Sequence, residues 1–431
     1  MTMFQRLLCC LAAVTILLRA EDTEREPLLD RLGVELHGFA DVRGGFRTAG
    51  GTRVDDGSVL EGRLQLETSY QGDLLTLQLR ADFVYDALAE DHNFDLNTGK
   101  GEMDLREAYL LFSPLEIMDV KIGRQILTWG TGDLVFLNDL FPKDWQAFFL
   151  GRDQEYLKAP SDALLIGLFP DFANIDLVFV PQFDPDRYVR GERLVFWNPG
   201  LGRLAGTDDA IDVETPDRWF QDVEVAGRIS KNIEGVELAL YGYSGFWKSP
   251  AGADPLTGNA VFPRLNVWGG SARGALLGGV ANAEFAFHDS PDDGDGDDPM
   301  TPNSEWRLLI GYERELAREL TIACQYYVEW MQDYAAYTRT LPTGIAKDEV
   351  RHYLTLRLTK LLMNQNLTLS LFVRYSPNED DVYLRPTASY KISDTWLFTA
   401  GGNIFLGAQD YTFLGQFQDN SNLYAALRYS F

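Results

Sequence analysis

The sequence predicts an all-β fold, a transmembrane antiparallel up-and-down β-barrel of about eighteen strands, with sixteen as the alternative count. Three observations predict it. Apolar and polar residues alternate over runs of about ten residues, the connections between runs are alternately short and long, and the last run ends on the terminal Phe431. A soluble β-sandwich would also alternate, but nothing would force its long loops to one end. Closing the sheet satisfies every backbone group in lipid.

The alternation is clearest over residues 74–85. Leu75, Leu77 and Leu79 fall on one face, and the residues between them are polar. The same pattern recurs along the chain. It predicts strands over 34–46, 58–71, 74–85, 103–113, 118–128, 161–170, 174–183, 221–230, 235–246, 265–276, 279–288, 305–315, 320–334, 350–361, 367–376, 381–392, 396–406 and 421–431.

The beginning of the chain has the pattern of a secretory signal peptide. Over residues 1–20, Arg6 precedes an apolar run and the small Ala20 precedes an acidic stretch. The run is shorter than the roughly 20 apolar residues of a membrane-spanning helix, and an uncleaved anchor is the alternative. Residues 21–33 are then a short periplasmic lead, and residues 34–431 form the barrel.

Composition excludes several function classes. Asp and Glu number 64 against 38 Lys and Arg, a net charge of −26, and no basic stripe interrupts this balance. Such a surface repels a phosphate backbone, which disfavours nucleic-acid binding. The four His residues have no metal-ligand spacing, and the chain has no GxSxG, Walker or HExxH motif. We therefore expect neither an enzyme nor a required cofactor.

The interior of the barrel is predicted to be charged and hydrated. A charged Arg or Lys facing lipid costs about 2–4 kcal/mol at mid-bilayer, so the polar face of each strand must turn inward. Two roles are open: bracing of the wall by Arg–carboxylate pairs, or a ladder of Arg side chains guiding an anionic solute. The predicted pore-lining residues are Arg43, Arg63, Arg80, Asp82, Arg228, Arg273, Arg307, Arg357, Arg374, Arg385 and Arg428.

The most distinctive connection covers residues 129–160. Connections this long in a compact fold are usually functional, and an aromatic loop left in water would expose a large apolar surface. We expect this loop to fold into the lumen as a constriction, with packing on the extracellular rim as the alternative. The residues expected to form the constriction are Trp129, Asp133, Phe136, Phe141, Trp145, Phe148 and Phe149.

An acidic loop over residues 289–299 is a candidate calcium site. Asp293, Asp295 and Asp297 have the alternate spacing of an oxygen-ligand loop. The bidentate Glu usual at position 12 is replaced by Ser304. A solvated acidic loop is therefore the competing interpretation.

One stretch of about 25 residues resembles a known family. The residues that carry the likeness are Gly123, Arg124, Gln125, Trp129, Gly130, Gly132, Asp133, Asn138, Phe141, Pro142 and Asp144. They resemble the GRQ...WG...GD...N...P motif of proteobacterial outer-membrane barrels in the alginate-export family and related uncharacterised porin-like families. The resemblance implies a monomeric outer-membrane channel. Alginate exporters have an Arg-rich, positive lumen, whereas the predicted lumen here is mixed.

These observations predict a porin-like channel of the bacterial outer membrane that passes small hydrophilic or anionic solutes. The alternatives are an export or lipid-transfer conduit working with a periplasmic or inner-membrane partner, and a structural or adhesive barrel. The expected surroundings are outer-membrane lipid and lipopolysaccharide. The strand ending on Phe431 resembles the signal that barrel-assembly machinery reads during biogenesis.

Overall fold

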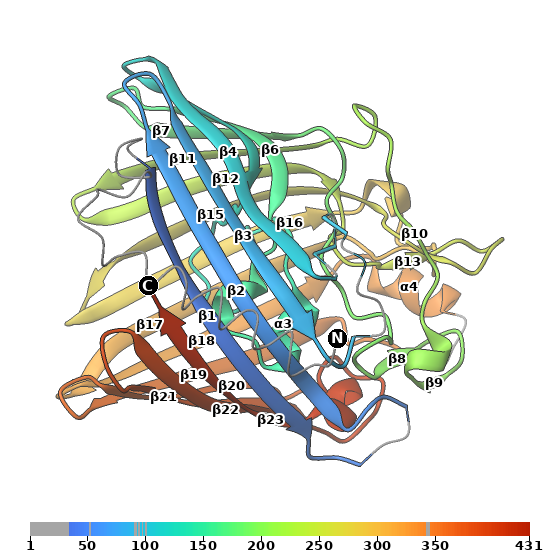
Figure 1. Ribbon diagram of the computed structural model, residues 1–431. Coiled ribbons are helices and arrows are strands. Elements are labelled where there is room, and N and C mark those ends of the chain that lie inside the picture. Colours follow the sequence, from blue (N-terminus) through green and yellow to red (C-terminus); the bar gives the residue numbers. More distant parts are fainter. Residues whose placement is uncertain are drawn as a thin grey trace, which may run out of the picture.

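The computed structural model describes residues 34–50, 53–89, 93, 95–96, 98–99, 101–341 and 345–431. Eighteen strands form one antiparallel sheet, and β1 (Val34–Arg47) pairs with β23 (Asn422–Ser430) to close it into a barrel (Figure 1). The fold class and the count of eighteen predicted from the sequence are confirmed. The predicted signal peptide and periplasmic lead lie outside the described residues.

The strands between β1 and β23 pair with their neighbours in chain order around the ring. They are β2 (Gly57–Gln71), β3 (Thr76–Asp86), β4 (Met103–Leu115), β5 (Met118–Gln125), β6 (Ser161–Leu168), β7 (Asn174–Val180), β11 (Glu224–Ile233), β12 (Val236–Phe246), β15 (Arg264–Leu276), β16 (Gly279–Asp289), β17 (Glu305–Ala317), β18 (Leu320–Met331), β19 (Val350–Leu362), β20 (Leu367–Ser376), β21 (Asp381–Lys391) and β22 (Trp396–Gly407).

The connections divide between the two ends of the barrel. One end carries short turns such as 234–235, 277–278 and 392–395, and the first and last strands also start and finish there. At the other end most connections are long, with 377–380 as a short exception. Figure 1 shows these longer loops gathered at the right of the barrel.

The long loops carry short elements of their own. A hairpin of β8 and β9 lies in the connection 181–223, and β10, β13 and β14 form a small separate sheet. No helix in the described part of the chain is long and apolar enough to cross a membrane. The elements in loops are α3 (Trp145–Leu150), η2 (Gln154–Leu157), β8 (Phe196–Asn198), β9 (Arg203–Ala205), η3 (Thr207–Asp209), β10 (Val213–Glu214), β13 (Gly252–Ala253), β14 (Ala260–Val261), η4 (Pro291–Asp293), α4 (Tyr334–Thr340) and η5 (Gly415–Asn420).

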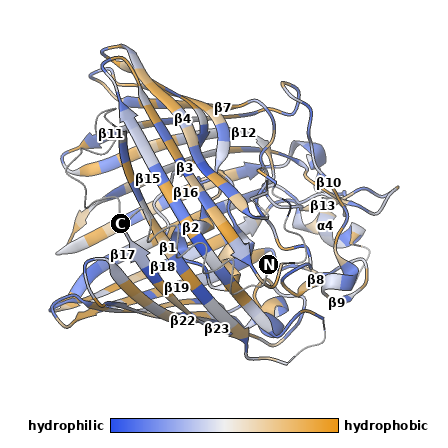
Figure 2. Ribbon diagram, viewed as in Figure 1, coloured by the Kyte–Doolittle hydropathy of each residue, from blue (hydrophilic) through white to orange (hydrophobic). Residues whose placement is uncertain are grey.

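The outer wall of the barrel is apolar. Leu240 and Ile310 each leave 61% of their surface exposed, whereas Leu309, the next residue along β17, is 1% exposed. Figure 2 shows the resulting alternation of hydrophobic and hydrophilic residues along the strands. Exposed apolar side chains around a closed sheet suit lipid and would be costly in water. Four exposed tryptophans lie near strand ends on this wall: Trp268, Trp306, Trp330 and Trp396.

Apolar residues also pack inside the barrel. One cluster joins Leu137 and Phe141 of the connection after β5 to inward residues of the wall such as Leu309 and Tyr353. A second cluster joins Phe148 and Phe149 to residues of β20–β22 and of two further loops. The interior is therefore partly filled by loops that carry their own apolar side chains.

A charge on the outer wall should destabilise the barrel. We expect Leu240→Arg to lower the free energy of unfolding by about 2–4 kcal/mol, because β12 would carry a guanidinium into lipid near mid-strand. The measurement is urea unfolding in phospholipid vesicles. Thr359→Arg, on the inward face of β19, is the control and should have a smaller effect. Equal losses in both variants would contradict the assignment of the two faces.

Candidate functional site: the inward loop

The connection between β5 and β6, residues 126–160, crosses the inside of the barrel, and we call it the inward loop. Its two stems are tied together. Arg124 at the end of β5 pairs with Asp162 at the start of β6, with Nε–Oδ1 at 2.9 Å and Nη2–Oδ2 at 2.6 Å. Gln125, fully buried, donates to the Ala163 carbonyl at 2.9 Å. The loop therefore leaves and rejoins the wall at one place.

One side of the loop is anchored on β16. The Glu284 carboxylate accepts hydrogen bonds from the backbone N–H groups of Thr131 and Gly132, the latter at 3.0 Å, and from the Asn138 side chain at 3.0 Å. Asn282 on the same strand donates to the Thr131 carbonyl at 3.1 Å. A carboxylate that accepts several N–H groups holds a chain segment firmly, because each donor would otherwise be unsatisfied.

A second anchor lies on β18 and β19. Arg357 pairs with Asp133 through two contacts, Nε–Oδ2 at 2.5 Å and Nη2–Oδ1 at 2.8 Å. The Asp133 backbone N–H donates to Gln325 Oε1 at 3.1 Å. The two-point pairing fixes the orientation of Asp133 as well as its position.

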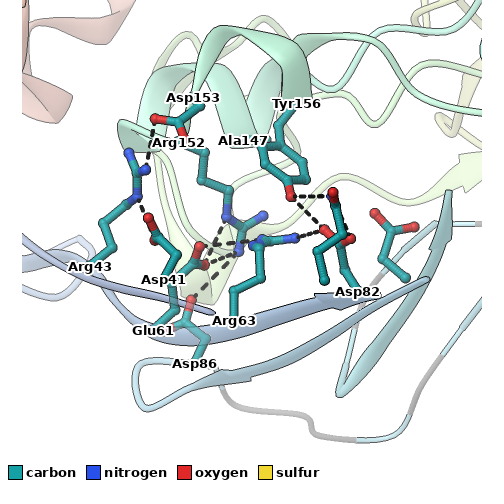
Figure 3. A network of polar contacts seen from close by, with 12 residues as sticks. Asp41, Arg43, Glu61, Arg63, Asp82, Asp86, Ala147, Arg152, Asp153 and Tyr156 are labelled. Atoms are coloured by element: carbon teal, nitrogen blue, oxygen red, sulfur yellow. Dashed lines mark hydrogen bonds and ion pairs between the residues drawn. The ribbon is translucent and has the colours of Figure 1, made fainter. Parts of the chain in front are cut away.

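The opposite side of the loop is anchored on β1 and its neighbours. Arg43 donates to the Gly151 carbonyl at 2.6 Å and to Asp153 Oδ1 at 2.7 Å. Arg428 of β23 pairs with the other oxygen of Asp153. Arg152 donates to Glu61 Oε2 at 2.8 Å. Figure 3 shows Arg43 reaching from β1 to Asp153 of the loop, and Arg152 reaching from the loop to Glu61.

A tyrosine completes this anchor. The Tyr156 hydroxyl donates to Asp82 Oδ2 at 2.6 Å, and the Arg63 guanidinium lies over the Tyr156 ring, 4.2 Å from its centroid (Figure 3). Arg63 also pairs with Asp82. Burial, with the Asp82 charge beside it, raises the pKa of Tyr156 well above its usual range, so the hydroxyl stays protonated and remains a donor.

Local sequence sets the shape of the loop between its anchors. The Asp144 carboxylate caps α3 by accepting the Ala147 N–H at 2.7 Å, and Gly151 ends the helix with φ at 96°. A Cβ atom at Gly151 would lie 2.4 Å from the Tyr424 ring. Asp144 also pairs with Arg187 at 3.3 Å, which links the inward loop to the connection 181–223.

The aromatic residues of the loop pack inside the barrel. Trp129 meets Phe141 edge to face at 4.9 Å. The ring centroid of Trp145 lies 6.0 Å from that of Phe136 and 5.9 Å from that of Phe149, on which it stacks. The Phe148 ring in turn contacts the Phe149 ring. The seven residues predicted to form the constriction thus all belong to this packed loop, Asp133 through its ion pair. That they narrow a passage stays a prediction.

The predicted pore-lining residues fall into groups. Contacts with the inward loop involve Arg43, Arg63, Asp82, Arg357, Arg385 and Arg428. Three further arginines form ion pairs with carboxylates of the wall: Arg80 with Glu107, Arg228 with Glu237 and Asp176, and Arg307 with Glu305. The Arg374 guanidinium lies over the rings of Tyr353 and Phe413, and Arg273 is exposed. Their role in lining a passage stays a prediction.

Sequence reasoning missed most of the anchor partners. Asp153 and Tyr156 lie within the predicted loop, but nothing in their spacing marks them as contacts of β1 and β3. Two side-chain amides, Asn403 and Asn422, donate to the Phe149 carbonyl at 3.0 and 2.8 Å. The alternation of polar and apolar residues placed several wall partners on the inward face, but it did not indicate which loop residue each one meets.

The acidic loop does not gather its carboxylates. Asp293 is buried and accepts the backbone N–H groups of Asp297 at 3.0 Å and Asp298 at 3.3 Å. Among the residues that the structure describes, no three His, Cys, Asp or Glu side chains are grouped to hold a metal ion. Calcium at Asp293, Asp295 and Asp297 stays an untested prediction.

Comparisons with known proteins give only distant likenesses. No family model matches the chain, and no curated protein matches it. Among solved structures, Salmonella typhi OmpF in complex with daunomycin aligns with a TM-score of 0.44 at 10% identity, over 92% of this chain and 97% of that one. A triple mutant of Rhodopseudomonas blastica porin aligns with a TM-score of 0.40 at 10% identity, over 92% of this chain and 100% of that one. The fold assignment rests on the chain's own ring of strands.

Removing the β16 anchor should loosen the loop. In Glu284→Ala the donors of Thr131, Gly132 and Asn138 lose their acceptor, which costs about 1–3 kcal/mol for a buried donor. We expect a lower midpoint of unfolding in urea and faster trypsin cleavage after Lys143 and Arg152. Glu313→Ala, an exposed carboxylate on β17, is the control. Unchanged cleavage in Glu284→Ala would show that this anchor does not hold the loop.

A second prediction concerns pH and Asp184, in the connection 181–223. Burial, and then the negative charge of Glu224, raise the pKa of Asp184 to about 6 from 3.8. The folded protein therefore keeps a proton that the unfolded chain has lost, so folding weakens as the pH rises through this window. This penalty, a lower free energy of unfolding, is complete above pH 6 and shrinks as the pH falls toward 3.8.

Asp184→Asn should remove this penalty. We expect the variant to keep its folded, SDS-resistant band to a higher temperature than the wild type at about pH 8, with a smaller difference at about pH 4.5. Asp208→Asn, an exposed carboxylate of the same connection, is the control and should change neither value. A difference between Asp184→Asn and the wild type that does not vary with pH would contradict the assignment.

Proposed function

We propose that this protein is a channel of the bacterial outer membrane for small hydrophilic or anionic solutes, and that the inward loop forms its narrowest part. The observation that carries the proposal is the crossing of a closed barrel by one loop that is anchored on opposite walls. Glu284 of β16 holds one side, Arg43 of β1 and Arg428 of β23 hold the other, and Arg357 of β19 holds the loop between them.

The two faces of the wall support the same proposal. Exposed apolar residues around the outside suit the hydrocarbon of a membrane, and charged side chains on the inside suit water and polar solutes. Most inward arginines are already paired, which favours bracing of the wall over a continuous ladder of free cations. Lipopolysaccharide as a neighbour and a monomeric state belong to this proposal, as does the likeness of the motif to the alginate-export and related families.

A conduit that is closed at rest is the second candidate. It is favoured by the two apolar clusters inside the barrel, in which Phe141, Phe148 and Phe149 pack against the wall. Such packing would have to separate for a large substrate to pass. A periplasmic or inner-membrane partner could supply the free energy for that step.

Conductance across a planar lipid bilayer tests the channel. We expect steady conductance from the refolded wild type and a several-fold increase when residues 136–149 are deleted, because the aromatic part of the inward loop is then gone. Deleting 291–299 from the acidic loop is the control and should leave conductance near that of the wild type. Resistance to SDS without heating establishes that each variant is folded.

The outcomes separate the two candidates. A folded wild type that is silent, with a deletion variant that conducts, would contradict the open channel and support the closed conduit. Silence in both folded proteins would contradict both candidates and favour a structural or adhesive barrel.

A further inference from the structure

A cavity with both charged and apolar lining residues lies between the inward loop and the wall. Its volume is about 370 Å³, within the range of roughly 300–1,000 Å³ that small-molecule sites occupy. Residues of β1 and of β19–β23 line it, and Asp153, Gln154 and Glu155 of the inward loop border it. Ser389 and Leu397, close to the short turn 392–395, also line it. A solute that enters from the short-turn end would meet this cavity before the aromatic part of the loop.

Most charges around the cavity neutralise one another. The Asp153 carboxylate pairs with both Arg43 and Arg428. The Asp41 carboxylate also lies near both guanidinium groups, with Oδ1 3.5 Å from Arg43 Nε and Oδ2 3.7 Å from Arg428 Nε. Arg357 is held by Asp133. These arginines therefore have carboxylate partners within the protein.

Arg385 on β21 differs from them. Only 7% of its surface is exposed, and it forms no ion pair with any residue that the structure describes. Its Nη2 donates to the Arg152 carbonyl at 3.0 Å, whereas Nε and Nη1 are buried and have no acceptor. Burying guanidinium donors without acceptors is costly. An anion in the cavity that Arg385 lines would place a negative charge beside this unpaired guanidinium.

Arg385 is also held in position. Its guanidinium lies over the Phe148 ring, 4.2 Å from the centroid, and the Arg152 carbonyl fixes one of its nitrogens. Stacking and one hydrogen bond orient the group before any ligand arrives. A ligand would therefore lose little free energy in ordering this side chain.

The remaining lining indicates the class of anion. Hydroxyl groups of neighbouring strands border the cavity, and the rings of Phe372 and Tyr424 add apolar surface; the hydroxyl residues are Ser370, Thr387, Ser389 and Thr399. Hydroxyl groups both donate and accept, and so match the hydroxyls of a ligand. Among the cations that line the cavity, Arg385 alone lacks a carboxylate partner in the part of the chain that the structure describes, and the carboxylates of Asp41, Asp153 and Glu155 would repel a second negative charge.

We propose that this cavity binds a small hydroxylated organic acid with a single carboxylate, and that Arg385 binds the carboxylate. The inference names the solute class of the proposed channel and in that sense rests on the proposed function. Ser370, Thr387 and Ser389 would contact the hydroxyl groups of the acid. A dianion such as phosphate is disfavoured by the nearby carboxylates.

Isothermal titration calorimetry on the folded protein in detergent tests the site. The probe is sodium D-gluconate, and sorbitol, which has the same carbon skeleton without the carboxylate, is the neutral control. We expect gluconate to bind and sorbitol not to bind. Arg385→Gln should weaken gluconate binding at least about tenfold, because it removes the unpaired cation. Arg203→Gln, in the hairpin of β8 and β9, is the matched control and should bind as the wild type does.

A second variant guards against misfolding of Arg385→Gln. Thr387→Val keeps the size of the side chain and every charge, and it should weaken gluconate binding severalfold. Absence of gluconate binding to the folded wild type would overturn the proposal, as would wild-type affinity in both variants. Phosphate binding as tightly as gluconate would overturn the assignment to a singly charged organic acid.

The calorimetric test is independent of conductance. Gluconate binding that depends on Arg385 in a protein that is silent in bilayers would support the site and contradict only the channel. A conducting protein that does not bind gluconate would support the channel and overturn the site.

Discussion

Charged side chains on the barrel wall hold the inward loop, and the arrangement of the interior depends on these contacts. A loop inside a barrel brings backbone N–H and carbonyl groups into a space where water is limited, so each group needs a partner. Glu284 supplies an acceptor on one wall, and Arg43 supplies donors on the other. Because the two anchors lie on opposite sides, the loop is stretched across the interior and does not lie flat against one wall.

The apolar packing follows from that position. Once Gly132 and Gly151 are fixed to the wall, the segment between them brings its aromatic rings against inward residues of the strands. The rings bury apolar surface that would otherwise face water. Connections 181–223 and 408–421 add further residues to the second cluster. The interior therefore combines a charged wall with apolar loops, and the cavity beside Arg385 lies between these two parts.

The sequence motif over residues 123–144 has a physical role in this structure. Arg124 and Gln125 join the stems, Asp133 and Asn138 bind the wall, and Asp144 caps α3. The glycines allow a close approach: a Cβ atom at Gly123 would lie 2.3 Å from the Ala108 carbonyl oxygen. A sequence pattern of this kind specifies the path of one loop, and it leaves the solute to other residues.

The sequence by itself determined the barrel. An alternation of period two fixes which face of each strand is apolar, and the order of short and long connections fixes how the strands pair, so all eighteen strands were predictable from local pattern. The sequence also located the loop and its aromatic residues. Only the tertiary structure decided which wall residues meet that loop. Asp153 lies 110 residues from Arg43, and the Phe149 carbonyl meets Asn422 from 273 residues away. Contacts at such separation depend on closure of the ring, which no local pattern records.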